Sequence, residues 1–175
     1  QHRIMDIGGG YGAFPRMLLH HFFNTKAFII ELPEVCALAG YYLSRAFPQK
    51  KVGMLSDLDS DYIKDGRYDW AEYDIYVLPT WAIQYLPDSS IDLVINTTSL
   101  GEMSRDYGEY YLQQIERTAR RYFYSNNRAE SKIARYDDFG FYNWQFEKRW
   151  HPILCNYSPS FHIEYLGMIE KGDPS

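Results

Sequence analysis

A run of glycines near the start of the chain limits the possible folds more than any other feature of the sequence. It reads Asp6-Ile-Gly-Gly-Gly-Tyr-Gly12 and follows a short apolar segment, Arg3–Ile7. Apolar residues at helical spacing follow it, from Ala13 to Phe22. Glycine is needed where a backbone turns sharply or approaches a ligand closely. Because the run leads into a helix whose first N–H groups lack intrahelical partners, we predict a ligand-binding loop.

The segments after this loop alternate between strand-like and helix-like patterns. Lys26–Leu32 is almost entirely apolar, as in a strand buried on both faces, and Pro33 opens an amphipathic helix that reaches Phe47. The later predicted elements are strands at Asp74–Leu78, Ile91–Thr97, Tyr122–Ser125 and Phe161–Lys171, and a helix at Arg105–Tyr122. Strands that alternate with helices predict an α/β fold with a mainly parallel sheet, whose ligands bind beyond the carboxyl ends of the strands.

The length of 175 residues suits a single domain with one core. We interpret residues 48–73 as an insertion, because Ser56–Glu72 is acidic and polar; a short strand is predicted within it at Val52–Leu55. Because the chain begins at Gln1, directly on a predicted strand, we expect further sequence upstream of it.

Charge and composition argue against several kinds of partner. The formal net charge of −5 disfavours a nucleic-acid binder, which needs a basic face. No segment approaches the ~20 apolar residues of a membrane span, and no signal peptide is evident, so we expect a cytoplasmic protein with free thiols at Cys36 and Cys155. The acidic run Asp57–Asp61 fails as a calcium loop because Tyr62 and Tyr68 stand where Gly and Glu are required. We therefore interpret this run as a solvated acidic loop and assign no metal-ligating residues in the sequence.

The glycine loop alone fits two kinds of cofactor. Gly8, Gly10 and Ala13 also satisfy the dinucleotide pattern, and Glu31, at the end of the second strand, can accept hydrogen bonds from a ribose in either case. Asp6 favours S-adenosyl-L-methionine, because a carboxylate repels a diphosphate and attracts the ammonium and sulfonium groups of that cofactor. A NAD(P)-dependent oxidoreductase is the alternative, disfavoured further by the lack of a Tyr-x-x-x-Lys pair.

Asp6–Gly12 and Glu31 together resemble the cofactor site of the class I S-adenosylmethionine-dependent methyltransferases. A narrower resemblance, to sugar O-methyltransferases, rests on Leu78–Trp81 and Ser90–Met103, with weak support from Asn126-Asn127. The resemblance implies a Rossmann-like three-layer α/β sandwich. Its sheet would be mostly parallel and seven-stranded with an antiparallel last strand, and one methyltransferase domain would span residues 1–175.

The same resemblance implies a set of cofactor-binding residues. The cofactor would lie across the loop with Glu31 on its ribose, Leu78 and Trp81 near its adenine, and Asn96 near its methionine end. The loop residues in this set are Asp6, Gly8, Gly10 and Gly12. The implied activity is methyl transfer to a hydroxyl of a small molecule, with a carbohydrate as the expected acceptor. A methyltransferase-like domain that only binds partners is a further alternative.

A sugar hydroxyl is a poor nucleophile, so a base or a metal must take its proton. Glu102, in the loop after the strand Ile91–Thr97, is the first candidate base, with Ser99 and Asn96 as orienting groups. Capping of the following helix is an equally good role for Glu102. The alternative bases are His151 and His162, and the side chains that stack on an acceptor or pack in the core are Asn143, Trp144 and Trp150.

Overall fold

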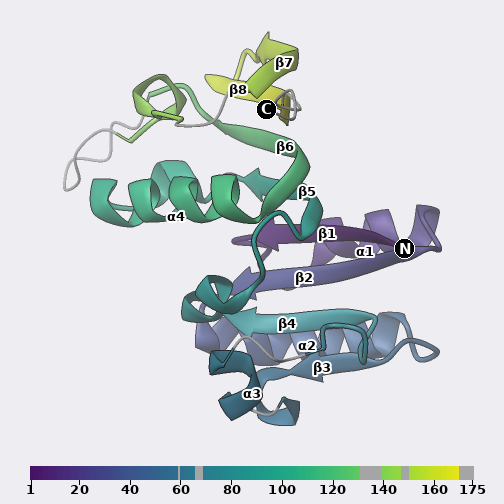
Figure 1. The fold of residues 1–175 in the computed structure, drawn as a ribbon. Helices are drawn as coiled ribbons and strands as arrows, with labels where there is room; N and C mark the ends of the chain where they lie inside the picture. Colours follow the sequence, from purple (N-terminus) through teal and green to yellow (C-terminus); the bar gives the residue numbers. More distant parts are fainter. Residues whose placement is uncertain (59, 66–68, 131–138, 147–149, 170–175) are drawn as a thin grey trace, which may run out of the picture.

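One mixed sheet runs through the protein, with β1 (His2–Ile7) near its centre (Figure 1). The computed structural model describes residues 1–58, 60–65, 69–130, 139–146 and 150–169. Within these ranges the sheet has eight strands in the order β3-β4-β2-β1-β5-β6-β8-β7. The other strands are β2 (Thr25–Glu31), β3 (Val52–Met54), β4 (Ile75–Pro79), β5 (Ile91–Thr97), β6 (Ala119–Arg128), β7 (Trp150–Tyr157) and β8 (His162–Ile169).

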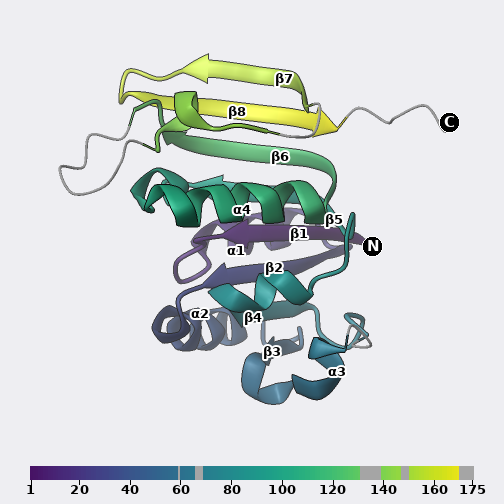
Figure 2. The ribbon, with the colours of Figure 1, turned by 60° about the vertical axis from the view of Figure 1, so that its left-hand side comes forward.

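Helices cover both faces of this sheet and give the expected three layers (Figure 2). On one face, Ile4 and Ile29 pack with residues of α1 (Ala13–His21) and α2 (Pro33–Ala46). On the other face, Met5 and Phe28 pack with residues of α3 (Ser60–Lys64) and α4 (Arg105–Thr118). Successive residues of the buried strands therefore point into two separate hydrophobic cores, one on each face of the sheet. For this reason their sequences are apolar throughout and do not alternate between apolar and polar residues.

The α/β, mostly parallel architecture is confirmed, with one strand more than expected. The predicted strand at Val52–Leu55 forms as β3 and pairs in parallel with β4, so it extends the sheet at that edge. The last strand, β8, runs antiparallel to β6 as expected. The eighth strand is β7, which was not predicted and pairs antiparallel with β8.

The boundary between α4 and β6 differs from the predicted one. A helix was predicted over Arg105–Tyr122, but α4 ends at Thr118 and β6 begins at Ala119. Ala119 and Tyr122 pair with Ile91 and Leu93 of β5, so hydrogen bonds between strands replace the last turn of the predicted helix. The predicted strand Tyr122–Ser125 is correspondingly longer and reaches Arg128.

The strand β7 was not predicted, and it lies at the open edge of the sheet. Most of its residues are exposed, so they lack the apolar alternation that marks a half-buried strand. Pro152 lies within it, and the pairing register shifts between Pro152 and Leu154. Edge strands tolerate proline and bulges, and both interrupt the sequence pattern by which a strand is predicted. Lys171, the predicted end of the last strand, lies outside the described residues.

Three other expectations concern features away from the sheet edge. In the part of the chain that the structure describes, no helix is both long and apolar enough to cross a membrane, and no three potential ligands gather around a metal position. Asp59 and Tyr68, which belong to the rejected calcium pattern, lie outside that part. Cys36 is buried and Cys155 is exposed, both as free thiols.

Candidate functional site

The glycine loop joins β1 to α1 at the carboxyl edge of the parallel strands. Gly8, Gly10 and Gly12 have φ angles of 70°, 56° and 93°, in the left-handed region that favours glycine. The Gly8 N–H donates to the carbonyl of Ile30 over 2.8 Å, which fastens the loop to β2. A Cβ on Gly8 would lie 2.3 Å from Ser99 Oγ, whereas one on Gly10 would meet nothing within 4 Å. Gly8 is therefore needed for packing within the protein, and Gly10 faces open space.

Glu31, the last residue of β2, holds the same loop from the neighbouring strand. Its Oε1 accepts a hydrogen bond of 3.1 Å from the Gly10 N–H, and its Oε2 accepts one from the Leu32 N–H. Each carboxylate oxygen has a second lone pair, so both can still accept hydrogen bonds from ribose hydroxyls. The two sequence-predicted features, the loop and the acid, therefore meet at one point.

Asp6 lies beneath the loop and not on its outer surface. Its side chain is buried, and a Cβ on Gly9 would lie 2.9 Å from Asp6 Oδ2. Burial, and secondarily the negative charge of Glu31, raise the pKa of Asp6 to about 7. Within the described residues, neither of its carboxylate oxygens has a hydrogen-bond partner. A buried carboxylate without a partner makes this region favourable for a positive charge.

A buried network of amide side chains joins the ends of three parallel strands. The Nδ2 of Asn96, at the end of β5, donates to the Ile7 carbonyl over 2.8 Å. The Nδ2 of Asn127, in β6, donates to Asn96 Oδ1 over 2.8 Å. The Ser99 hydroxyl donates to the Ile7 carbonyl over 3.2 Å and accepts from Asn96 Nδ2. This network places Asn96 and Ser99 beside the loop. In the sequence, the only indication that Asn127 belongs to this site was the Asn126-Asn127 pair after a predicted strand.

Two of the three candidate bases line one small cavity of about 50 Å³ at this edge. Glu102 is exposed and ends the 3-10 turn η3 (Leu100–Glu102), whereas α4 begins only at Arg105. In the described structure, the Glu102 carboxylate accepts no hydrogen bond from the first turn of α4, so the capping role has no support. The cavity is lined by Thr98, Gly101, Glu102, Asn127, Arg128 and His162.

The pairing of β6, β8 and β7 separates the two candidate histidines. His162 opens β8 and pairs with Arg128 at the carboxyl end of β6, and its Nδ1 lies 3.0 Å from Asn126 Oδ1. His151 pairs with Met168, which also pairs with Tyr122 near the start of β6. His151 therefore lies toward the opposite end of the strands from the glycine loop.

The loop after β4 presents Trp81 but not Leu78. Trp81, in the 3-10 turn η2 (Thr80–Tyr85), is 43% exposed, whereas Leu78 is fully buried in the core. Trp81 borders a cavity of about 480 Å³ between this turn and the start of α4. The other residues around this cavity are Thr80, Ser104, Asp106, Tyr107, Tyr110 and Tyr111. Leu78 therefore supports the loop from below.

Trp144 and Trp150 pack within the protein. Trp144 Nε1 donates to the Phe139 carbonyl and Trp150 Nε1 donates to Glu116 Oε1, each over 3.0 Å. Both rings also contact Phe123 of β6, with centroid distances of 6.4 and 5.9 Å. Their indole groups are thus occupied by internal contacts, so core packing and not acceptor stacking explains them. Asn143, in the 3-10 turn η4 (Phe141–Asn143), is half-buried beside Trp144.

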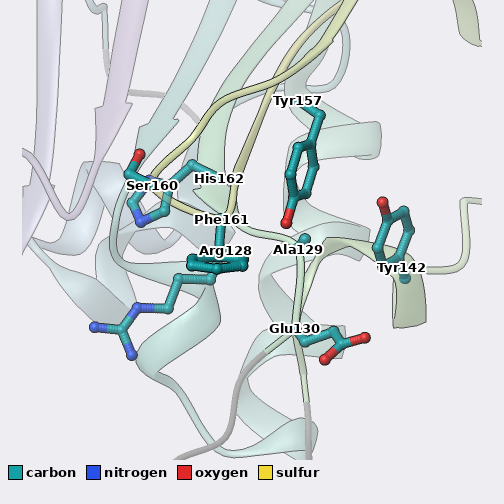
Figure 3. A pocket seen from close by; sticks show the side chains of 8 residues that line it. All are labelled: Arg128, Ala129, Glu130, Tyr142, Tyr157, Ser160, Phe161 and His162. Atoms are coloured by element: carbon teal, nitrogen blue, oxygen red, sulfur yellow. The ribbon is translucent and has the colours of Figure 1, made fainter.

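A larger cavity, of about 850 Å³ (Figure 3), lies next to the small one. Arg128 and His162 line both cavities, so the two are neighbours. Residues from the end of β6, from η4 and from the β7–β8 turn line it: Arg128, Ala129, Glu130, Tyr142, Tyr157, Ser160, Phe161 and His162. Sequence reasoning missed this cavity, because its residues come together only when β8 returns beside β6.

The sheet order, the glycine turn after β1 and the acid at the end of β2 define the Rossmann-like fold of the class I methyltransferases. No family model matches the chain, and no curated protein matches it. Among solved structures, an S-adenosylmethionine-dependent methyltransferase from Aquifex aeolicus aligns with 96% of this chain and 82% of its own, with 14% identity and a TM-score of 0.54.

Two further structures show the same fold. An O-methyltransferase family 2 protein from Planctomyces limnophilus, in complex with apigenin, aligns with 95% of this chain at 10% identity and a TM-score of 0.62. This chain spans 49% of that protein's length. Magnesium protoporphyrin IX methyltransferase from Synechocystis, with bound S-adenosylmethionine, aligns with 95% of this chain and 69% of its own, at 10% identity and a TM-score of 0.55. At such identities the likeness establishes the fold.

Proposed function

We propose that the protein binds S-adenosyl-L-methionine and transfers its methyl group to a hydroxyl of a small molecule, with a sugar or a similar polyhydroxylated compound as the expected acceptor. The observation that carries this proposal is the contact between Gly10 and Glu31. It places a carboxylate that can accept ribose hydroxyls against a loop whose Gly10 leaves open space for a ligand.

The charges around the loop fit a cationic cofactor without phosphate. Asp6 and Glu31 are both acidic, and burial together with the negative charge of Glu31 raises the pKa of Asp6. A bound sulfonium and ammonium would supply a compensating positive charge, whereas a diphosphate would be repelled. The same electrostatics disfavour a NAD(P)-dependent oxidoreductase.

The proposed binding residues act in different ways. Glu31 would accept the ribose hydroxyls, Asp6 would provide a negative potential beneath the loop, and Trp81 would border the adenine. Gly8, Gly10 and Gly12 give the loop its left-handed turns. Asn96 and Ser99 would act as positioning residues, because their side chains already bond to each other and to the end of β1.

The cofactor supplies an electrophilic methyl group, and the protein must align the acceptor oxygen and remove its proton. Glu102 is the proposed base, because it is exposed, carries no internal bond to α4 and borders the small cavity at the strand ends. The Glu102 carboxylate would take the hydroxyl proton of the acceptor as the acceptor oxygen receives the methyl group that the cofactor would supply. His162, across the same cavity, is the second candidate.

Thermal unfolding with S-adenosylhomocysteine or NAD tests this proposal. A ligand at one hundred times its Kd stabilises the folded state by roughly 2.7 kcal/mol. We expect S-adenosylhomocysteine to raise the melting temperature by a corresponding amount and NAD to leave it unchanged. We expect Glu31→Ala to abolish this shift in melting temperature. Glu34→Ala, which removes an exposed acid from the first turn of α2, is the matched control and should keep the shift. A shift with NAD alone, or with neither compound, would overturn the assignment.

A further inference from the structure

The larger cavity has the size and position of a binding site for a small acceptor molecule. Its volume of about 850 Å³ lies within the usual range for small-molecule sites. It shares Arg128 and His162 with the small cavity that Glu102 lines, so a molecule bound in it would lie next to the cavity of the proposed base. The chemistry of its lining therefore bears on the nature of the acceptor.

Three exposed aromatic rings border this cavity. Tyr142, Tyr157 and Phe161 are 64%, 57% and 71% exposed, and they come from η4, the end of β7 and the β7–β8 turn. The rings of Tyr157 and Phe161 meet edge to face, with centroids 6.4 Å apart. Figure 3 shows the two tyrosines on one side of the cavity and Phe161 with Arg128 on the other. Exposed rings in such an arrangement favour a flat or ring-shaped ligand.

The backbone at Phe161 is strained, and its exposed ring is held there by the fold. Phe161 has a φ of 61°, which is uncommon for a bulky residue. The Ala129 N–H donates to the Phe161 carbonyl over 2.8 Å, and the Phe161 N–H donates to the Ser158 carbonyl over 3.1 Å. Thr98, which lines the small cavity, has a φ of 56°. Strained residues of this kind cluster at ligand sites.

Arg128 gives one end of the cavity a positive charge. Its side chain is exposed, and none of the ion pairs among the described residues involves it. Figure 3 shows its guanidinium and the carboxylate of Glu130 pointing to opposite sides. A guanidinium binds a carboxylate through two parallel hydrogen bonds, which is a strong and directional contact. Arg128 therefore favours an acceptor with an anionic group near its reacting hydroxyl.

We propose that the acceptor is a hydroxylated ring that carries a carboxylate, bound with its ring among Tyr142, Tyr157 and Phe161 and its carboxylate on Arg128. This proposal rests on the proposed methyltransferase function and narrows its acceptor. A sugar acid and an aromatic hydroxy acid share this chemistry, so the experiment includes both.

Calorimetric titration of the protein saturated with S-adenosylhomocysteine tests the proposal. The probes are glucuronate against glucuronamide, and 2-hydroxybenzoate against 2-hydroxybenzamide, pairs that differ in charge more than in shape. We expect at least one acid to bind ten times or more tighter than its amide, and the tighter acid identifies the type of ring. Equal binding within both pairs, or no binding of either acid, would overturn the proposal.

Two variants test whether the preference for the acid over its amide arises in this cavity. Arg128→Gln should remove the preference for the acid, whereas Arg45→Gln, an exposed arginine in the last turn of α2, should keep it. Phe161→Gly should weaken acid binding tenfold or more without lowering the melting temperature, because it deletes the ring and relieves the backbone; a purely structural Phe161 would show the reverse. Retained preference in Arg128→Gln would refute the proposal. A melting shift with S-adenosylhomocysteine is scored separately, so failure of the cofactor assignment remains distinguishable.

Discussion

The side-chain amide of Asn127 donates a hydrogen bond of 2.8 Å to Oδ1 of Asn96, and so joins β6 to β5 at the edge where the glycine loop lies. The Asn96 amide continues to the carbonyl of Ile7, at the end of β1. Both side chains are fully buried. Three strand ends are thus held in register by two asparagines, and the position of Ser99 against Gly8 depends on this arrangement.

We expect Asn127→Ala to lower the free energy of unfolding by about 1–3 kcal/mol, because it leaves Asn96 Oδ1 buried with fewer donors. Chemical denaturation measures this loss. Asn156→Ala, an exposed asparagine of β7, makes the same chemical change outside the network and should alter the free energy by no more than about 0.5 kcal/mol. Equal effects of the two substitutions would show that the network does not stabilise the strand ends.

Two glycines of the loop should respond differently to alanine. Gly8→Ala would place a Cβ 2.3 Å from Ser99 Oγ, so we expect a loss of several kcal/mol, on the order of 3 or more, in unfolding free energy. Gly10→Ala meets nothing within 4 Å and should cost only about 1 kcal/mol, from its positive φ. Because Gly10 faces the proposed cofactor, Gly10→Ala should still weaken S-adenosylhomocysteine binding, measured by titration. Unchanged binding in this variant would contradict the placement of the ligand on the loop.

Asp6 should make stability depend on pH. Its pKa rises from 3.8 to about 7 on folding, so between these values the native state binds more protons than the unfolded chain. The stability contributed by Asp6 therefore falls as pH rises from about 4 to about 7, by a total on the order of 4 kcal/mol, and is constant above that window. Asp6→Asn removes this dependence.

Urea unfolding at several pH values between 4.5 and 8 checks the sign of this effect. The stability of Asp6→Asn relative to the unsubstituted protein should rise with pH across this range. A relative stability of Asp6→Asn that fell with pH would mean that the folded protein stabilises the ionised carboxylate.

The two groups at the small cavity can be separated kinetically. Removal of a general base costs about 10²–10⁴ in rate, so Glu102→Gln should lower kcat by such a factor and leave S-adenosylhomocysteine binding unchanged. His162→Asn should lower kcat less than tenfold. Rates are measured as transfer of labelled methyl to whichever hydroxy acid the protein binds. The opposite ranking of the two variants would assign the base to His162.

The first half of the fold follows from local sequence. The strand, glycine turn, helix and strand from His2 to Glu31 each have their own pattern, and the parallel crossover then brings Glu31 to Gly10 without further information. The burial of Asp6 beneath the loop was not evident from the sequence. Side chains alternate between the two faces of a strand, but this alternation does not reveal that the side chain of a single acidic residue is buried. In the structure Asp6 is buried on the same face of the sheet as Ile4 and Ile29.

The second half depends on contacts between distant segments. Ala119–Tyr122 fits a helix by pattern but becomes strand because β5 offers pairing partners. Asn127, Arg128 and His162 meet because β8 pairs with β6 in one register, and no local pattern fixes that register. The separation of His162 from His151 has the same origin.

The outermost strand, β7, has a consequence for how molecules of this protein behave toward one another. An exposed strand at a sheet edge presents free amide and carbonyl groups on which a second chain can assemble. Pro152 lacks an N–H and the adjacent register shift bends the strand, so this edge is a poor template for such growth. The proline and the register shift, which also made β7 hard to predict from the sequence, therefore protect the concentrated protein against aggregation through this edge.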